Sequence, residues 1–118
     1  MATPNNVLLT LAAVTISSGG TASTGFATGG YPIVAVGMPG AWTAAGLSLQ
    51  GSFDDSTYAA LKDAYGNEIT ATVAASTVVQ LDPTTALGVP YVKLVSGTNA
   101  SAVTQAGDRS ITVAFKVM

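Results

Sequence analysis

The sequence contains no cysteine and no histidine among its 118 residues. The lack of cysteine excludes a disulfide framework and any thiolate site. The lack of histidine removes Ser-His-Asp catalysis, histidine acid–base chemistry and nearly all zinc sites. The ionisable chemistry that remains would need the six carboxylates, which are Asp54, Asp55, Asp63, Glu68, Asp82 and Asp108.

Charged residues are also scarce, at 8% of the chain against about 25% in an average soluble domain. The net charge is −2, and the four basic residues are scattered, so a nucleic-acid partner is not expected. No apolar run reaches the roughly 20 residues of a membrane span, and the run Val7–Ile16 lacks the basic residue that precedes a signal sequence. We therefore expect neither nucleic-acid binding nor a membrane location.

What the sequence has instead is 48% hydrophobic residues, many of them alanine, with thirteen glycines and many threonines and serines. The surface of a protein with this composition must be covered mainly by small, uncharged side chains. Few charges leave a free monomer poorly protected against association. The composition therefore favours a protein that works within an assembly, as a homo-oligomer or in several copies.

Short apolar segments separated by turn residues occur every 8–14 residues or so, and none keeps a helical period. The length fits one domain. This pattern predicts an all-β fold, a jelly-roll-like β-sandwich of about eight short antiparallel strands. The expected strands are Val7–Ile16, Tyr31–Val36, Leu47–Phe53, Tyr58–Lys62, Glu68–Val73, Thr77–Leu81, Tyr91–Ser96 and Ser110–Val117.

Four strands carry specific expectations. In the last two, Val92 and Leu94 are expected to point inward, and Ile111, Val113, Phe115 and Val117 share one face. In the third strand, Leu47, Leu49 and Phe53 share one face, which we expect to point into the core. In the first, the apolar positions change phase, and a bulge near Ala12 and Ala13 would reconcile them.

Turn chemistry predicts the connections between strands. Residues 54–56 and 63–67 read as turns, with Gly66 available for a positive φ. Asp82 followed by Pro83 predicts a single capped helical turn over 82–87.

Residues 1–30 are expected to form an N-terminal strand and a glycine-rich arm, and residues 31–118 the sandwich body, within a single domain. The stretch 17–30 holds five glycines and reads as a mobile loop or one ordered by a neighbour. Phe26 is its one large side chain and is the expected anchor on a partner.

Four aromatic residues are the candidate interaction residues, namely Phe26, Tyr31, Trp42 and Tyr65. No catalytic, metal or cofactor residue is assigned. Calcium binding by residues 63–68, sugar binding on Trp42 and the tyrosines, and glycosylation at Asn99 stay open as weaker alternatives. Asp108 and Arg109 are expected to form a local ion pair.

Four segments in order resemble a family of small virion proteins of tailed bacteriophages, described as head decoration, cement or head-fibre proteins. They are MPGAWTAAGLSLQGSFD (38–54), LKDAYGNEITATVAAS (61–76), VVQLDPTTALGVPYVKLVSGT (78–98) and VTQAGDRSITVAF (103–115). The resemblance covers about two thirds of the chain. Residues 1–30 are less typical of the family and are expected to adapt this member to its own capsid.

The resemblance implies a structural protein that is not an enzyme and has no cofactor. It would be made in the host cytoplasm and sit on the capsid surface of the virion, in contact with the major capsid protein and its own copies. The alternative is a carbohydrate- or receptor-binding jelly roll on a phage fibre or capsid surface. A hydrolase that uses two converging carboxylates is the weakest hypothesis.

Overall fold

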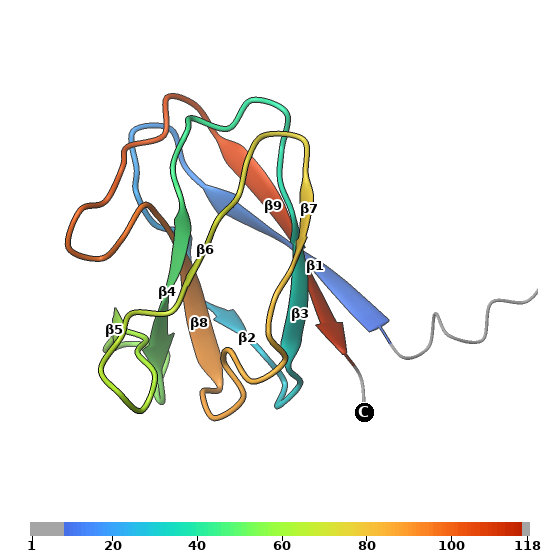
Figure 1. Ribbon diagram of the computed structural model, residues 1–118, viewed down its shortest axis with the longest axis vertical. Helices are drawn as coiled ribbons and strands as arrows, with labels where there is room; N and C mark the ends of the chain where they lie inside the picture. The colour runs from blue at the N-terminus through green and yellow to red at the C-terminus, as the bar shows by residue number, and fades with distance from the viewer. Residues whose placement is uncertain (1–8, 117–118) are drawn as a thin grey trace, which may run out of the picture.

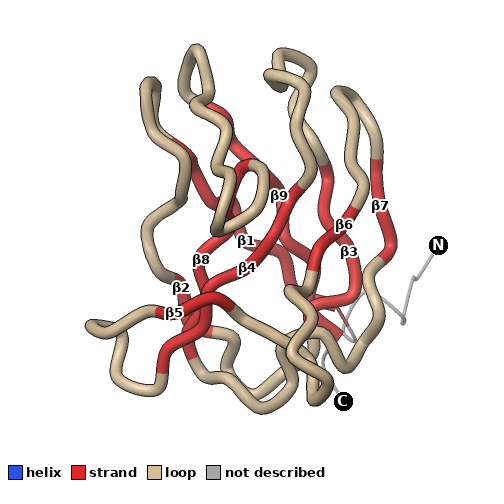
Figure 2. Tube along the Cα trace, turned by 60° about the vertical axis from the view of Figure 1, so that its left-hand side comes forward, coloured by secondary structure: helices blue, strands red, loops and turns tan. Residues whose placement is uncertain are grey.

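The computed structural model describes residues 9–116, which form nine strands and no helix (Figures 1 and 2). All strand pairs are antiparallel and make two sheets, so the predicted all-β sandwich is confirmed. The strands are β1 (Leu9–Ile16), β2 (Phe26–Ala27), β3 (Ile33–Gly37), β4 (Leu47–Ser52), β5 (Ala59–Ala60), β6 (Thr70–Ala71), β7 (Val78–Gln80), β8 (Tyr91–Ser96) and β9 (Arg109–Lys116).

The first sheet has the order β1-β9-β3-β7, and the second has the order β2-β8-β4-β5, with β6 also paired to β4. The strands β5 and β6 can be counted as one interrupted edge strand, because both lie along β4. The chain then crosses from one sheet to the other at every connection except the one after β4. This order is that of an eight-stranded jelly roll.

The core lies between the two sheets and is built from the inward-facing residues of the longer strands. Its fully buried side chains come from β1 and β3, from β8, and from β9, and they are Ile16, Ile33, Val36, Val92, Leu94, Ile111 and Val113. The predicted inward faces of the last two long strands are therefore confirmed for every described residue. Val117, which shares that prediction, lies outside the described residues.

The first strand is regular, and the predicted bulge near Ala12 and Ala13 is wrong. Each residue from Leu9 to Ile16 has one partner on β9, without a shift in register. The phase change arises because Leu9 and Leu11 point outward and are exposed, while Val14 and Ile16 point into the core. The irregularity lies in β3 instead, between Ile33 and Ala35.

The glycine-rich stretch 17–30 is held by the chain's own strands, which corrects the expectation of a loop that is mobile or ordered by a neighbour. The Ser23 amide donates to Leu94 O at 2.9 Å, and the Thr28 amide donates to Pro90 O at 2.9 Å. Phe26 pairs with Val92, so this stretch forms the edge of the second sheet. Its small residues let the stretch run close beside β8. The glycine content alone did not predict this pairing.

Phe53 is 82% exposed, so its predicted inward orientation is wrong. The Ser52 hydroxyl accepts hydrogen bonds from the amides of Asp54 at 3.2 Å and Asp55 at 3.0 Å, and it donates to the Asp54 carboxylate. The chain therefore turns directly after Ser52, and the alternation of β4 ends one residue too early for Phe53 to enter the core.

The two predicted turns over 54–56 and 63–67 are confirmed. The Asp54 carboxylate accepts from the amides of Ser56 and Thr57, both at 2.9 Å. The tip of the second turn has Gly66 at φ +84°, the left-handed conformation that glycine adopts without a Cβ penalty.

Residues 82–89 form successive i→i+3 turns rather than the predicted helical turn. The Thr85 amide donates to Asp82 O at 2.9 Å, and the Val89 amide donates to Ala86 O at 3.2 Å. The capping role of Asp82 is nevertheless confirmed, because its carboxylate accepts from the Thr84 amide at 3.0 Å.

A buried polar side chain, Gln105, joins two long loops, and no pattern in the sequence predicts its burial. Its amide nitrogen donates to Thr43 O at 3.0 Å and to Ser96 Oγ at 2.8 Å. Its amide oxygen accepts from the Thr43 amide at 2.9 Å and from Arg109 Nε at 3.0 Å. Arg109 therefore serves this network, while Asp108 accepts from the Ser18 amide at 2.7 Å, so the expected pair between Asp108 and Arg109 is replaced by two separate contacts.

No helix long and apolar enough to cross a membrane occurs within residues 9–116.

Candidate interaction surfaces

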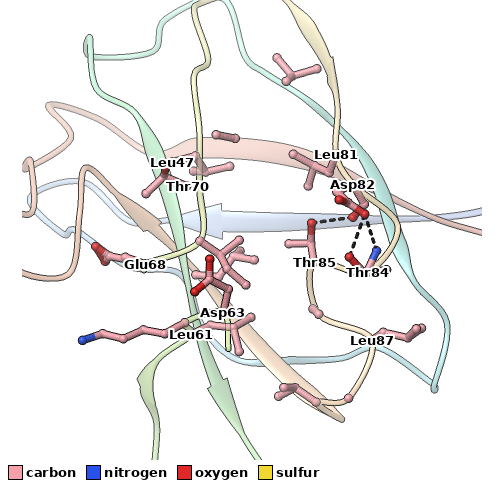
Figure 3. Close-up of a pocket in the computed structure, with 18 of the residues that line it drawn as sticks. Leu47, Leu61, Asp63, Glu68, Thr70, Leu81, Asp82, Thr84, Thr85 and Leu87 are labelled. Atoms are coloured by element: carbon pink, nitrogen blue, oxygen red, sulfur yellow. Dashed lines mark hydrogen bonds between the residues drawn. The ribbon is translucent and has the colours of Figure 1, made fainter. Parts of the chain in front are cut away.

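A groove of about 770 Å³ opens at the side of the sandwich, between the 61–69 hairpin and the 82–88 turns (Figure 3). Its apolar lining comes from both sheets and includes Leu47, Leu49, Leu61, Ile69 and Leu81. This volume is within the range of about 300–1,000 Å³ that small-molecule sites have. The groove is therefore the first place to look for a ligand.

The three carboxylates beside the groove all have structural partners. The Asp82 carboxylate accepts from Thr84, as Figure 3 shows, and the Asp63 carboxylate accepts from the amides of Tyr65 and Asn67 at 2.9 Å each. The Glu68 carboxylate accepts from the Asn99 side-chain amide at 2.7 Å. Each therefore fixes a turn or a loop.

These backbone hydrogen bonds lower the pKa of Asp63 and of Asp82 below the ordinary aspartate value. A general acid needs the opposite, a pKa raised toward the working pH. The groove thus offers ionised acceptors above an apolar floor. That arrangement suits noncovalent binding better than proton transfer.

Calcium was an alternative for residues 63–68. The Asp63 carboxylate accepts from the Asn67 amide within its own hairpin, whereas the Glu68 carboxylate accepts from the Asn99 side chain. The two carboxylates therefore have different partners. Among residues 9–116, no group of three or more Asp or Glu side chains is placed to hold a metal ion.

The side chain of Asn99, the predicted glycosylation site, is also engaged in hydrogen bonds within the protein. Its amide nitrogen also donates to Leu49 O at 3.2 Å, and its amide oxygen accepts from Gln50 at 2.9 Å. In this fold, the side chain that the sequon marks for glycosylation is used to tie the 97–107 loop to β4.

The structure separates the four candidate interaction residues into two groups. Trp42 is only 7% exposed and donates through Nε1 to Ala45 O at 3.1 Å, and Phe26 packs edge-on against Phe115 with centroids 6.1 Å apart. Tyr31 is exposed, and Tyr65 is 90% exposed at the tip of the 61–69 hairpin. Only the two tyrosines can offer an aromatic face to a partner without rearrangement.

Five exposed apolar residues are not among those candidates, namely Leu9, Leu11, Phe53, Val78 and Leu87, of which Phe53 and Leu87 lie in loops. The signal for Phe53 was the serine and aspartates around it, which favour a turn over a longer strand. Leu87 stands at the end of the 82–88 turns, where no strand pattern continues to bury it.

The loops that carry Tyr31, Phe53 and Leu87 emerge at one end of the sandwich, the lower end in Figure 1. The register explains this, because Tyr91 at the start of β8 pairs with both Ser52 and Ala27. The segments 28–32, 53–57 and 82–90 therefore leave the sheets at the same level. We call these three segments the loop end.

A polar cluster borders the loop end. The Tyr58 hydroxyl donates to the Asp55 carboxylate, and the Lys93 ammonium lies 4.5 Å from the centre of the Tyr58 ring. Burial, together with the hydrogen bond to Asp55, raises the pKa of Tyr58 to about 12. A Cβ on Gly25 would lie 2.0 Å from the Tyr58 hydroxyl, so this glycine makes room for the ring.

No protein-family model matches the chain, and no curated protein matches it in sequence. Among solved structures, the SPBc2 prophage-derived protein YomS is similar to it, with a TM-score of 0.52. The similarity covers 91% of this chain and 93% of YomS, at 14% sequence identity. At that identity the comparison shows a shared fold, and function has to be argued from the surfaces.

Proposed function

We propose that this protein is a structural component of a tailed-phage virion, which decorates or cements the capsid through contacts with the major capsid protein and with its own copies. The sequence resemblance supports this proposal, and so does the prophage origin of YomS. The observation that carries it is the loop end, where large apolar side chains are exposed on a chain with very few charges.

The loop end has the chemical composition of a protein interface. Exposed Tyr31, Phe53 and Leu87 provide the apolar part, and Asp54 and Asp82 stand beside them as exposed, ionised groups. Stable interfaces combine an apolar centre, often aromatic, with a polar rim. A monomer that kept these side chains in water would gain nothing from them.

The mechanism is surface burial across joints between capsid subunits. Burying one such side chain stabilises a contact by about 1.5–3 kcal/mol. Several copies around a symmetry axis add avidity, so internal pressure has to break many such contacts at once.

The test is sedimentation of the protein with undecorated capsids, followed by heating of bound and bare shells. Wild type should co-sediment stoichiometrically and raise the disruption temperature. Changing both Phe53 and Leu87 to serine should weaken binding at least tenfold, since tenfold is about 1.4 kcal/mol. The matched control is Val78→Ser, another exposed residue, which lies toward the opposite end of the sandwich because it pairs with Gly37 at the end of β3.

No binding by wild type would refute the capsid role. Equal loss in the Val78→Ser control would refute the loop end as the contact surface. Binding that leaves the disruption temperature unchanged would make the protein a decoration rather than a cement.

A second candidate function, recognition of a carbohydrate or a receptor, is favoured by Tyr65. This ring is exposed at the hairpin tip, two residues before the exposed Asn67, and aromatic faces and amides are common in sugar sites. The buried position of Trp42 removes the other expected platform. Glycan arrays with wild type and Tyr65→Ala test this function, and binding that depends on Tyr65 would support it.

A further inference from the structure

Strand β1 ends the first sheet and pairs on one edge alone. All eight of its residues pair with β9, and no other strand within residues 9–116 pairs with it. The other strands at the ends of the two sheets are short, with two residues in β2, two in β5 and three in β7. The longest free edge of the described chain is therefore β1.

This edge lacks the features that normally prevent pairing between proteins. Natural edge strands carry charges, prolines or bulges, or are kept very short. The sequence of β1, LTLAAVTI, has no charge and no proline, and its register is unbroken over eight residues. Its outward face also exposes Leu11, at 65%, with Leu9 beside it.

We propose that β1 pairs antiparallel with β1 of a second copy across a two-fold axis, so that the two first sheets become one continuous sheet. This inference stands apart from the proposed capsid role, because the dimer forms from the protein alone. Pairing by strand addition supplies backbone hydrogen bonds along the whole edge, and the side chains select the partner.

A second copy is the occupant that the chemistry of β1 fits. A two-fold axis perpendicular to the sheet keeps inward residues opposite inward residues, and it can pass through the Ala12 pair or the Ala13 pair. On the outward face, Leu11 then lies opposite Ala13 or Thr15 of the other copy. In either register no two charged side chains lie opposite each other, because β1 contains none. A charged partner strand would find no oppositely charged side chain on β1 to pair with.

The proposed contact also gives a closed assembly of two copies. The contact uses the same patch on both copies, so it stops at two and does not grow into a fibre. Eight residues at about 3.4 Å each give a seam about 27 Å long. A contact made by a single pair of strands is smaller than a standard interface of about 1,600 Å², so we expect a reversible dimer whose population depends on protein concentration.

The first experiment is sedimentation velocity of the purified protein over a range of concentrations. Wild type should shift from monomer to dimer. A double variant, Leu11→Lys with Ala13→Lys, places like charges opposite each other in both registers and should remain monomeric. Both positions are exposed, so the fold is retained, and Trp42 fluorescence checks this. The matched control is Val78→Lys on β7, the other free edge of the same sheet, which should dimerise like wild type.

The second experiment uses the absence of cysteine, which makes single-cysteine labelling unambiguous. Ala13→Cys should form a disulfide dimer if the axis passes through Ala13, and a mixture of Ala13→Cys with Leu11→Cys should do so if it passes through Ala12. Thr112→Cys is the control, since Thr112 pairs with Ala13 on β9. Its two copies would be three strand spacings apart, about 14 Å, which is too far for a disulfide.

A protein that stays monomeric at every concentration overturns the proposal. It is also overturned by a dimer that survives the lysine pair or is lost in Val78→Lys. A monomer whose capsid binding disappears in the lysine pair would assign the β1 edge to the capsid protein instead. Failure of capsid binding with an intact dimer would affect only the proposed function.

Discussion

The Gln105 network gives a sharp test of how the loops are held. Gln105→Leu keeps the volume of the side chain but removes its four hydrogen bonds, of 2.8–3.0 Å. Both backbone groups of Thr43 then lose their partner. At about 1–3 kcal/mol for each unsatisfied buried group, the free energy of unfolding should fall by about 2–6 kcal/mol. Domains of this size have only about 5–15 kcal/mol in total.

The assay is urea unfolding followed by the fluorescence of Trp42, the single tryptophan, which is buried and adjacent to Thr43. With a denaturant slope of about 2 kcal/mol per molar, a loss of about 4 kcal/mol lowers the midpoint by about 2 M. Gln80→Leu is the matched control, because Gln80 is exposed and should change stability by less than about 0.5 kcal/mol. If Gln105→Leu behaves like this control, the hydrogen bonds of Gln105 do not hold the loops.

Two further predictions concern Tyr58. Gly25→Ala should destabilise the protein by about 1–3 kcal/mol, because the new Cβ would displace the hydroxyl of Tyr58, whereas Gly88→Ala meets nothing within 4 Å and should be neutral in the same thermal unfolding assay. A similar loss in both variants would contradict the close contact. The folded-state pKa of Tyr58, about 12, lies above the ordinary 10.0, so its contribution to stability is complete below pH 10.0 and is lost as the pH rises through about 12. Tyr58→Phe should therefore flatten the loss of stability over that interval, measured by urea unfolding at each pH, and an unchanged profile would refute this assignment.

The long strands were predictable because their apolar residues alternate against a buried face. Ile111, Val113 and Phe115 show this pattern without interruption, and they are buried. Turn chemistry was equally local, as the carboxylate of Asp63 and the conformation of Gly66 illustrate. Short-range patterns of this kind need no knowledge of the partner strand.

Two features escaped prediction because they depend on a partner far along the chain. Phe26 is ordered by β8, and Gln105 is buried because Thr43 and Ser96 surround it. Nothing in the neighbouring residues of either one specifies those contacts. The candidate interaction surfaces were harder to predict, because the exposure of Phe53 depends on the exact residue at which β4 ends.

Strand β9 occupies the position between β1 and β3, and this has a consequence for synthesis. The first described strand emerges from the ribosome about a hundred residues before β9, which is its only partner strand within residues 9–116, since Leu9 pairs with Lys116. Such long-range closure slows folding and leaves apolar segments unpaired while the chain grows. A nascent chain stopped before residue 109 would leave both β1 and β3 without their common neighbour. The half-made protein should therefore depend on chaperones, and a truncation that removes β9 should unfold the whole first sheet rather than shorten it.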